Sequence, residues 1–365
     1  MRILLITGSY PPMRCGVGDY SERLAHALTH YAGLGVDVLT STLDHIPPIE
    51  QPPAVHYEMT SWAKAGVRDF IKVMRRIRPQ VVHIQFPTQG YVQAVDALAW
   101  IPLLCRYLFR VPVVQTWHEY VPDREPNILR CMYAMALGAN ALVVVRPDYA
   151  TKIPPLMRLA LRRTPIRFIA NISNIPTVRL SDEQRQVIRR RLGTGSSNLV
   201  AHFGFAYDHK GSDLLFQIAD PERDHILFIG ELLSQDPYHA RILQAAASPR
   251  WRGKATVTGF VGRAEAAELL AAADAVVFPY LRGGGIWNSA MHAATVQGTF
   301  VIATSSTEEG YDADRNIYYV KPGDTEEMKR ALARYSGTRQ PRALDAEASW
   351  RQLASAHRAV YESVT

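Results

Sequence analysis

Cysteine is scarce in this chain of 365 residues, which contains three: Cys15, Cys105 and Cys131. The number is odd and the spacing does not match that of a metal site, so neither a disulfide framework nor a zinc cluster is expected. No other metal site is predicted. Thiols used so sparingly fit a protein of the reducing cytoplasm.

Long apolar runs are also absent. No uninterrupted stretch reaches the ~18 residues that a membrane-spanning helix needs, and Asp96 and Arg106 interrupt the most apolar helix candidate, residues 95–109. The apolar run Ile3–Ile6 near the start is too short for a secretory signal and is better interpreted as a first strand. We therefore expect no spanning segment.

The sequence does contain enough apolar material for a sizeable core. Apolar residues make up 47% of the chain and charged residues 21%, which is typical of a globular protein. The length predicts two domains of roughly 150–200 residues each. Residues 1–180 hold 20 Lys and Arg against 12 Asp and Glu, while the whole chain has a net charge of +7. All the excess positive charge thus lies in the first half.

Two short basic segments stand out in that half, residues 72–78 and 158–167. Each can be a solvated helix face. Each can instead be attracted to an anionic membrane surface. Nucleic acid is not expected as a partner, because zinc-ligand spacing, a helix-turn-helix signal and an aromatic RNA-binding strand are all missing.

Short apolar runs alternate with helical segments along the whole chain. The runs are apolar throughout, which is typical of strands buried on both faces of a parallel sheet. The expected strands are residues 2–7, 36–41, 81–85, 111–117, 141–145 and 166–171, then 199–205, 226–230, 255–260, 275–280, 300–304 and 317–320.

This pattern predicts an α/β protein with two doubly wound, Rossmann-like parallel-sheet domains. We expect them at residues 1–178 and 179–349, with a hinge within 175–195 and a C-terminal helix, 350–365, packing back on the first domain. Ligands of such sheets bind outside the carboxyl ends of the strands. Two sheets that face each other would form a cleft there.

In the first domain, several polar or small residues follow predicted strands. Gly16 and Gly18 would let the backbone approach a ligand, although Ser21 breaks the dinucleotide pattern G-x-G-x-x-G and makes a nicotinamide enzyme the minor alternative. His118 ends a central strand beside Glu119 and is expected to face the ligand. Asn174 lies at the hinge, where a simple turn role is the alternative.

In the second domain, Lys210 stands before a glycine at a helix start, where an ammonium can bind phosphate. Arg263 starts another helix after a strand. Gly283, Gly284 and Gly285 are predicted to open a helix whose exposed amides and dipole would favour a nucleotide diphosphate. Close packing of the backbone is the alternative use of these glycines.

With these residues assembled, the chain resembles the GT-B glycosyltransferases, specifically the large retaining family four. The resemblance covers nearly the whole length and is most specific at five segments: Val82-His-Ile-Gln85, His118-Glu119-Tyr120, Ser173-Asn-Ile-Pro176, Lys210-Gly211 and residues 298–304.

The resemblance implies that the N-terminal domain takes the acceptor and the C-terminal domain the nucleotide-sugar donor. It places the family's glycine loop on Gly16 and Gly18, its cleft histidine on His118 and its phosphate-binding lysine on Lys210. Asp19 and Glu119 are expected on the acceptor side.

The chain departs from the family pattern at two places. The usual pair of glutamates would fall on Gly285 and Ala293, and the arginine that accompanies the lysine would fall near Phe205. The sequence therefore looks like a divergent branch in which Asn288 and Ser289 take over sugar contacts.

The resemblance implies retaining, metal-independent transfer from a UDP- or GDP-linked sugar to a hydroxyl acceptor, with no other cofactor. A lipid-linked glycan of polysaccharide biosynthesis would suit the basic first half, in a cytoplasmic protein held at the inner face of a membrane. Two alternatives remain open. One is a non-catalytic protein that binds nucleotide or glycan, and the other is a nucleotide-sugar epimerase.

Overall fold

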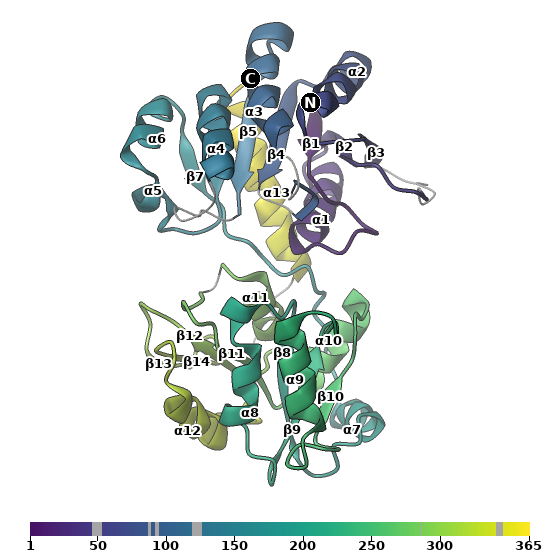
Figure 1. The fold of residues 1–365 in the computed structure, drawn as a ribbon, viewed down its shortest axis with the longest axis vertical. Coiled ribbons are helices and arrows are strands. Elements are labelled where there is room, and N and C mark those ends of the chain that lie inside the picture. The colour runs from purple at the N-terminus through teal and green to yellow at the C-terminus, as the bar shows by residue number, and fades with distance from the viewer. Residues whose placement is uncertain (46–52, 87–88, 92–94, 119–125, 286, 341–345) are drawn as a thin grey trace. The chain divides into compact units, whose positions relative to one another are not determined.

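The computed structural model describes residues 1–45, 53–86, 89–91, 95–118, 126–285, 287–340 and 346–365 (Figure 1). The chain forms two compact units. Unit 1 comprises residues 1–170 and 348–365, and unit 2 comprises residues 171–347. Glu119, predicted on the acceptor side, lies outside the described residues. No described helix is long and apolar enough to cross a membrane.

Unit 1 contains a parallel sheet with the strand order β3-β2-β1-β4-β5-β6-β7. Its strands are β1 (Arg2–Ile6), β2 (Gly35–Ser41), β3 (Ala54–Met59), β4 (Val81–Phe86), β5 (Val113–Trp117), β6 (Ala141–Val144) and β7 (Ile166–Phe168). Its helices are α1 (Gly16–His30), α2 (Val67–Ile77), α3 (Asp96–Leu104), α4 (Pro126–Gly138), α5 (Tyr149–Lys152), α6 (Pro155–Ala160) and α13 (Ala346–Glu362).

Strand β4 shows why the sheet is covered on both faces. Val82, Ile84 and Phe86 point into the apolar cluster built by α3 and α4, whereas His83 points the other way and contacts α13. Figure 1 shows α3 and α4 on one side of the strands and α13 on the other.

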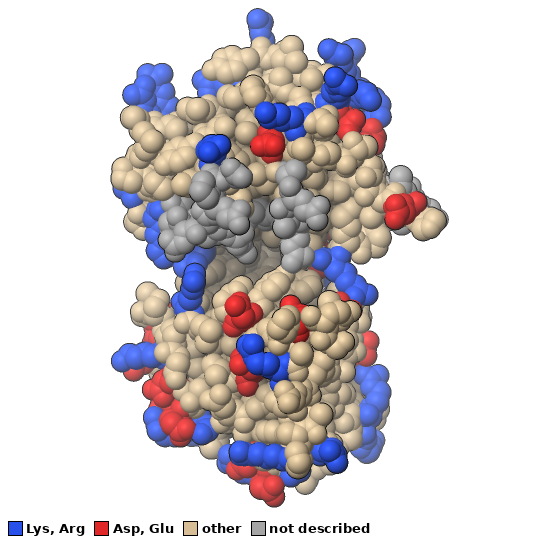
Figure 2. Space-filling model, viewed as in Figure 1, with Lys and Arg blue, Asp and Glu red and all other residues tan. Residues whose placement is uncertain are grey.

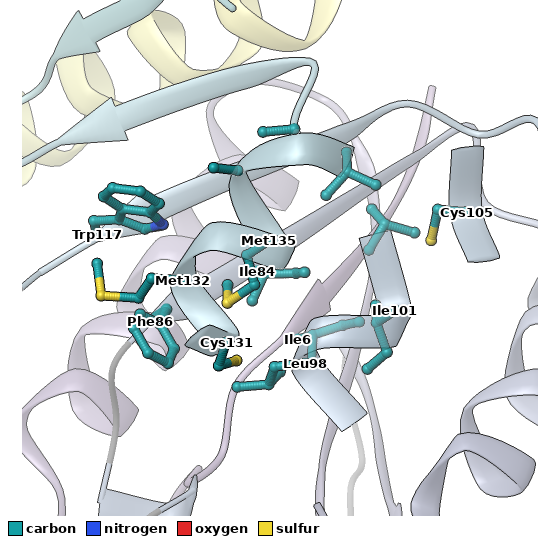
Figure 3. Packing of buried hydrophobic residues seen from close by; sticks show 14 of the residues in the cluster. Ile6, Ile84, Phe86, Leu98, Ile101, Cys105, Trp117, Cys131, Met132 and Met135 are labelled. Atoms are coloured by element: carbon teal, nitrogen blue, oxygen red, sulfur yellow. The ribbon is translucent and has the colours of Figure 1, made fainter. Parts of the chain in front are cut away.

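An apolar core of unit 1 lies between the sheet, α3 and α4 (Figure 3). Phe86 and Trp117 from neighbouring strands meet Cys131 and Met132 of α4, and all four are buried. Burying one such large side chain contributes about 1.5–3 kcal/mol. Burial also raises the pKa of the Cys131 thiol to about 12, so this cysteine is a neutral core residue.

Unit 2 repeats the plan with the strand order β10-β9-β8-β11-β12-β14-β13, parallel except for β13. Its strands are β8 (Asn198–Phe203), β9 (Asp224–Ile229), β10 (Ala255–Val257), β11 (Ala275–Phe278), β12 (Val301–Thr304), β13 (Gly310–Asp312) and β14 (Ile317–Val320). Its helices are α7 (Asp182–Arg191), α8 (Leu215–Ile218), α9 (Pro237–Ala247), α10 (Arg263–Ala272), α11 (Ser289–Thr295) and α12 (Thr325–Tyr335).

The predicted α/β architecture with two parallel sheets is confirmed, but each sheet contains a strand that the sequence pattern does not predict. These are β3 and β13, which lie at the edges. Their sequences, Ala-Val-His-Tyr-Glu-Met and Gly-Tyr-Asp, are mixed in polarity because an edge strand is only partly covered. A search for uniformly apolar runs therefore passes over them.

The stretch that leaves unit 1 is held by α11 of unit 2 and by the turn that follows this helix. The backbone N–H of Ser173 donates to His292 Nδ1 at 3.0 Å, and that of Val178 donates to Gln297 Oε1 at 2.9 Å. Gln297 Nε2 donates in turn to the carbonyl of Pro176 at 2.8 Å. These bonds make residues 173–178 part of unit 2.

The C-terminal helix α13 packs on unit 1. The ring of Trp350 lies 5.6 Å from that of Tyr20 in α1. Arg358 Nη1 donates to the carbonyl of Ala32 at 3.0 Å, and the Tyr361 hydroxyl lies 2.8 Å from His83 Nδ1. Both ends of the chain thus belong to the same unit.

Both units bury neutral histidines. Burial lowers the pKa of His357 in unit 1 and of His202 in unit 2 to about 4, from an ordinary value of 6.5. Burial also lowers the pKa of His83, helped by the nearby His357 and His118. Such groups must take up protons when the chain unfolds in acid.

Stability should therefore fall as the pH drops below 6.5. The unfolded state then binds protons that the folded state excludes, and each of the two histidines with a pKa of about 4 costs roughly 2 kcal/mol between pH 7 and pH 5. Urea unfolding at the two pH values measures the loss. The variant His357→Leu should make this loss of stability smaller for unit 1 and leave it unchanged for unit 2. Equal free energies of unfolding at both pH values would contradict the prediction.

Candidate functional site

Both sheets reverse their strand order beside the first strand of the unit. In unit 1 the reversal lies between β1 and β4, and in unit 2 between β8 and β11. The loops after these strands diverge to opposite faces, which leaves a crevice at the carboxyl ends where ligands of such sheets bind.

Lys210 lies at the reversal point of unit 2. It ends the 3₁₀ turn Asp208–Lys210 in the loop after β8, and its ammonium lies 4.3 Å from the ring centroid of Tyr280, which follows β11. The backbone N–H of Leu281 donates to the carbonyl of His209 at 3.0 Å and ties the two loops together. A half-buried cation is thus held over an aromatic face, an arrangement that fixes its position.

Gly211 explains why a glycine follows this lysine. Its φ is +63°, and a Cβ added there would lie 2.4 Å from the carbonyl oxygen of Pro279. Any side chain would therefore push the lysine loop away from the end of β11.

His202 helps to hold the same loop in place through a hydrogen bond with Ser212. It is buried in β8, its Nδ1 donates to the carbonyl of Val277 at 2.9 Å, and the hydroxyl of Ser212 donates to its Nε2 at 2.9 Å. Burial and the nearby Lys210 keep the imidazole neutral by lowering its pKa to about 4. The sequence offered no signal for this histidine beyond its place in an apolar run.

The three glycines do not open a helix, contrary to the prediction. Helix α11 begins at Ser289. The amide of Gly283 donates to the carbonyl of Tyr280 at 3.1 Å, and that of Gly284 donates to the carbonyl of Thr304 at 2.7 Å. These two donors are therefore already used and are not directed at a ligand.

The glycines instead let aromatic rings pack against the backbone. A Cβ on Gly284 would lie 2.6 Å from the ring of Tyr280, and one on Gly285 would lie 2.2 Å from the ring of Trp287. Close packing, the alternative interpretation, is thus what the structure shows. The glycine loop thus keeps the Tyr280 ring in contact with the Lys210 ammonium.

Asn288 and Ser289 mark the start of α11. Asn288 Oδ1 accepts from the amides of Ala290 at 3.0 Å and Met291 at 3.4 Å, and the hydroxyl of Tyr280 lies 3.3 Å away. Asn288 is therefore the N-cap, and the predicted sugar contact would compete with that role. Ser289 is the first helical residue and is half-buried.

The remaining predicted donor residues lie apart from Lys210 in the fold of unit 2. Arg263 begins α10 after the edge strand β10, which is separated from β8 by β9. Asn174 lies in the segment held by α11 and is half-buried. Ala293, one of the two positions that carry glutamate in the resembling family, is buried in the apolar core of unit 2.

In unit 1, Gly16 and Gly18 belong to the first turn of α1, directly after the loop from β1. Gly16 is exposed. A Cβ on Gly18 would lie 3.0 Å from the carbonyl oxygen of Ser9, so glycine lets this turn approach the β1 loop closely. Asp19 follows in the same turn and is half-buried.

His118 lies at the carboxyl end of β5 and is joined to a buried polar chain. Its Nε2 lies 2.7 Å from Gln85 Oε1, and Gln85 Nε2 lies 3.1 Å from His83 Nε2. Because an amide oxygen only accepts, Nε2 of His118 carries the proton. The edge of the Tyr20 ring packs against the imidazole at 5.0 Å between centroids.

Gln85 is a site residue that the sequence analysis did not single out. It belongs to the quoted segment Val82-His-Ile-Gln85, but its position on a strand gave no indication that its amide would face His118. Among the described residues, no group of three or more His, Cys, Asp and Glu side chains is arranged to hold a metal ion.

Comparisons with known proteins agree with the division into two units. Residues 15–171 match the family model described as Glycosyltransferase Family 4, and residues 198–336 match the model described as Glycosyl transferases group 1. Comparison of the sequence with curated proteins found no match.

Solved structures share the fold over the whole chain. Sucrose-phosphate synthase from Thermosynechococcus elongatus has a TM-score of 0.71 at 18% identity, covering 100% of this chain and 97% of that one. HepE from Anabaena, in complex with UDP and glucose, has a TM-score of 0.71 at 17% identity, covering 100% and 99%. UDP-GlcNAc 2-epimerase from Methanocaldococcus jannaschii has a TM-score of 0.61 at 12% identity, covering 99% and 100%.

The fold is therefore GT-B, with two Rossmann-like units. The two matched family models divide between these units and together span most of the described chain. Residues 15–171 thus form a Glycosyltransferase Family 4 domain, and residues 198–336 form a Glycosyl transferases group 1 domain.

Proposed function

We propose that this glycosyltransferase moves a sugar, with retention of the anomeric configuration, from a nucleotide diphosphate sugar to a hydroxyl acceptor without a metal ion. The observation that carries the proposal is the position of Lys210. Its ammonium is half-buried over the ring of Tyr280, at the carboxyl edge between β8 and β11. A fixed cation at such a point suits a diphosphate.

The chemistry follows from the charge on the leaving group. The bond between the anomeric carbon and the diphosphate oxygen breaks, and a new bond forms from that carbon to the acceptor oxygen. On a front-face path the departing phosphate oxygen takes up the acceptor proton. Lys210 would stabilise the negative charge that develops on the diphosphate. No pair of catalytic carboxylates is needed, unlike in a glycosidase.

His118 would position the transferred sugar. Gln85 accepts from its Nε2, so the imidazole is held in one orientation at the end of β5. An imidazole held in one orientation suits hydrogen bonding to a sugar hydroxyl. Gly16, Gly18 and Asp19 lie at the other unit 1 position where a ligand would approach, the first turn of α1.

For the donor we propose a UDP- or GDP-linked sugar. HepE, which shares the fold, was solved with UDP and glucose. For the acceptor we propose a lipid-linked glycan of polysaccharide biosynthesis, because the excess positive charge of the chain lies in its first half. The protein would then work on the cytoplasmic face of a membrane.

Two other functions have specific observations in their favour. A non-catalytic nucleotide- or glycan-binding protein is favoured by Gly285 and Ala293, which stand where the resembling family has glutamates. A nucleotide-sugar epimerase is favoured by the shared fold with UDP-GlcNAc 2-epimerase. Fold alone does not decide among these functions.

Incubation with a panel of UDP-, GDP-, ADP- and dTDP-sugars separates the three functions. Nucleotide release that requires an acceptor supports transfer, and product formed without an acceptor supports epimerisation. Binding without turnover in the presence of the true acceptor supports the non-catalytic protein. NMR of the anomeric proton of the product tests retention.

Substituting Lys210 should affect turnover much more than stability. Lys210→Ala removes a preorganised cation from the leaving group, and loss of one such contact lowers kcat on the order of 10²–10³-fold. Steady-state nucleotide release and thermal unfolding measure the two effects. Lys254→Ala, an exposed lysine paired with Glu222 in the same unit, is the control. Normal turnover of Lys210→Ala would remove this lysine from the site.

Gln85 should act as a positioning residue for His118. Gln85→Leu removes the acceptor of the His118 N–H and should lower kcat/KM on the order of 10²-fold, close to the effect of His118→Ala. Gln85→Glu keeps an acceptor oxygen and should recover part of the activity. Thr116→Val removes a contact to His83 but leaves the Gln85–His118 bond, so it serves as the control. Equal losses of kcat/KM in Gln85→Leu and Gln85→Glu would argue that the role of Gln85 is purely structural.

A further inference from the structure

The two basic segments of unit 1 differ in how their apolar residues are used. In α2, which contains the first segment, the apolar residues Val73, Met74 and Ile77 are buried. Lys72 pairs with Asp69 at 3.8 Å, and Arg76 donates to Glu58 at 3.1 Å. This segment is an ordinary amphipathic surface helix whose polar face is solvated.

Residues 156–168, which contain the second segment, expose large apolar side chains instead. Leu156 and Leu159 of α6 are 65% and 58% exposed, and Phe168 of the edge strand β7 is 49% exposed. The two leucines are three residues apart and therefore share one face of the helix. Met157, between them, is buried and anchors α6 to the core.

Cations surround these apolar residues. Arg162, Arg163 and Arg167 are exposed, and none of them has a carboxylate partner among the described residues. Residues 146–170 contain six Lys and Arg but one acidic residue, Asp148, which is paired with Arg146 and Lys152. Figure 2 shows basic side chains along the margin of unit 1 that carries α5 and α6.

We propose that this surface, the basic edge formed by Leu156, Leu159, Arg162, Arg163 and Phe168, docks on an anionic lipid bilayer. Leucine and phenylalanine side chains can insert among the acyl chains, while arginine guanidinium groups bind lipid phosphates. Each basic residue near an anionic surface strengthens binding about five-fold. The exposed apolar side chains distinguish this edge from α2, whose Val73, Met74 and Ile77 are buried.

Charge complementarity argues against a second copy of the chain as the occupant. A symmetric dimer would bring the same patch of both copies together, and the arginines would face each other. An anionic bilayer offers the opposite charge. The inference deepens the proposed function, on which its link to a lipid-linked acceptor rests, but docking itself is independent of turnover.

Co-sedimentation of the full chain with vesicles tests the proposal. The chain should pellet with vesicles of phosphatidylcholine and phosphatidylglycerol and stay in solution with phosphatidylcholine alone. Added salt should weaken the binding, because it screens the charges. Failure to pellet with the anionic vesicles overturns the proposal.

Variants locate the binding surface. Arg162→Glu with Arg163→Glu should weaken binding at least about tenfold, and Leu156→Ser with Leu159→Ser should do so by about tenfold because the inserted apolar groups are lost. The matched control, Arg68→Glu with Arg75→Glu, makes the same charge change on exposed positions of α2 and should leave binding within about twofold. A control that weakens binding as much as the first pair assigns it to net charge and overturns the proposal.

Two further measurements distinguish lipid docking from dimer formation and from failure of the proposed function. Sedimentation equilibrium without lipid would reveal a dimer that Leu156→Ser with Leu159→Ser dissolves, and that result would assign the edge to a second copy instead. Nucleotide release with a water-soluble acceptor should be unchanged in the edge variants. If every variant and the wild-type chain lack turnover while vesicle binding follows the pattern above, the proposed function fails and the docking surface stands.

Discussion

The parallel pairing of β8 with β11 determines where the candidate chemistry of unit 2 lies. In these strands Val200 pairs with Ala275 and Ala201 pairs with Val276, and the strand order of the sheet reverses between them. The loops that follow them are tied together by backbone, and the Lys210 ammonium lies over the Tyr280 ring as a consequence. Gly211 is required because the two loops approach too closely for a side chain.

In unit 1 a chain of buried polar groups has the corresponding role. It runs from His118 through Gln85 and His83 to Tyr361 in the C-terminal helix. Such networks are stable only when each member is satisfied, and they then fix one orientation of each side chain. The last helix of the sequence thereby helps to define the end of β5, although more than two hundred residues separate the two along the chain.

The surface of unit 1 shows that net charge alone does not identify a docking face. Both basic segments are rich in arginine, yet α2 buries its apolar residues and pairs part of its charge. The edge carrying Leu156 and Leu159 leaves these two leucines exposed, and Arg162 and Arg163 have no carboxylate partner among the described residues. The two basic segments differ in how well neighbouring elements cover their apolar residues. Strand β7 is the last strand of its sheet, and no further strand covers this end among the described residues.

The sequence by itself determined the two parallel-sheet units, because strands buried on both faces need continuous apolar runs such as Ile3–Ile6. It also indicated the Lys210 turn, whose chemistry is local. Only the tertiary structure decided that Gly283 and Gly284 donate their amides within the loop and that Gln85 faces His118. Periodicity reports whether a residue is buried, whereas its hydrogen-bond partner comes from a strand or loop distant in sequence.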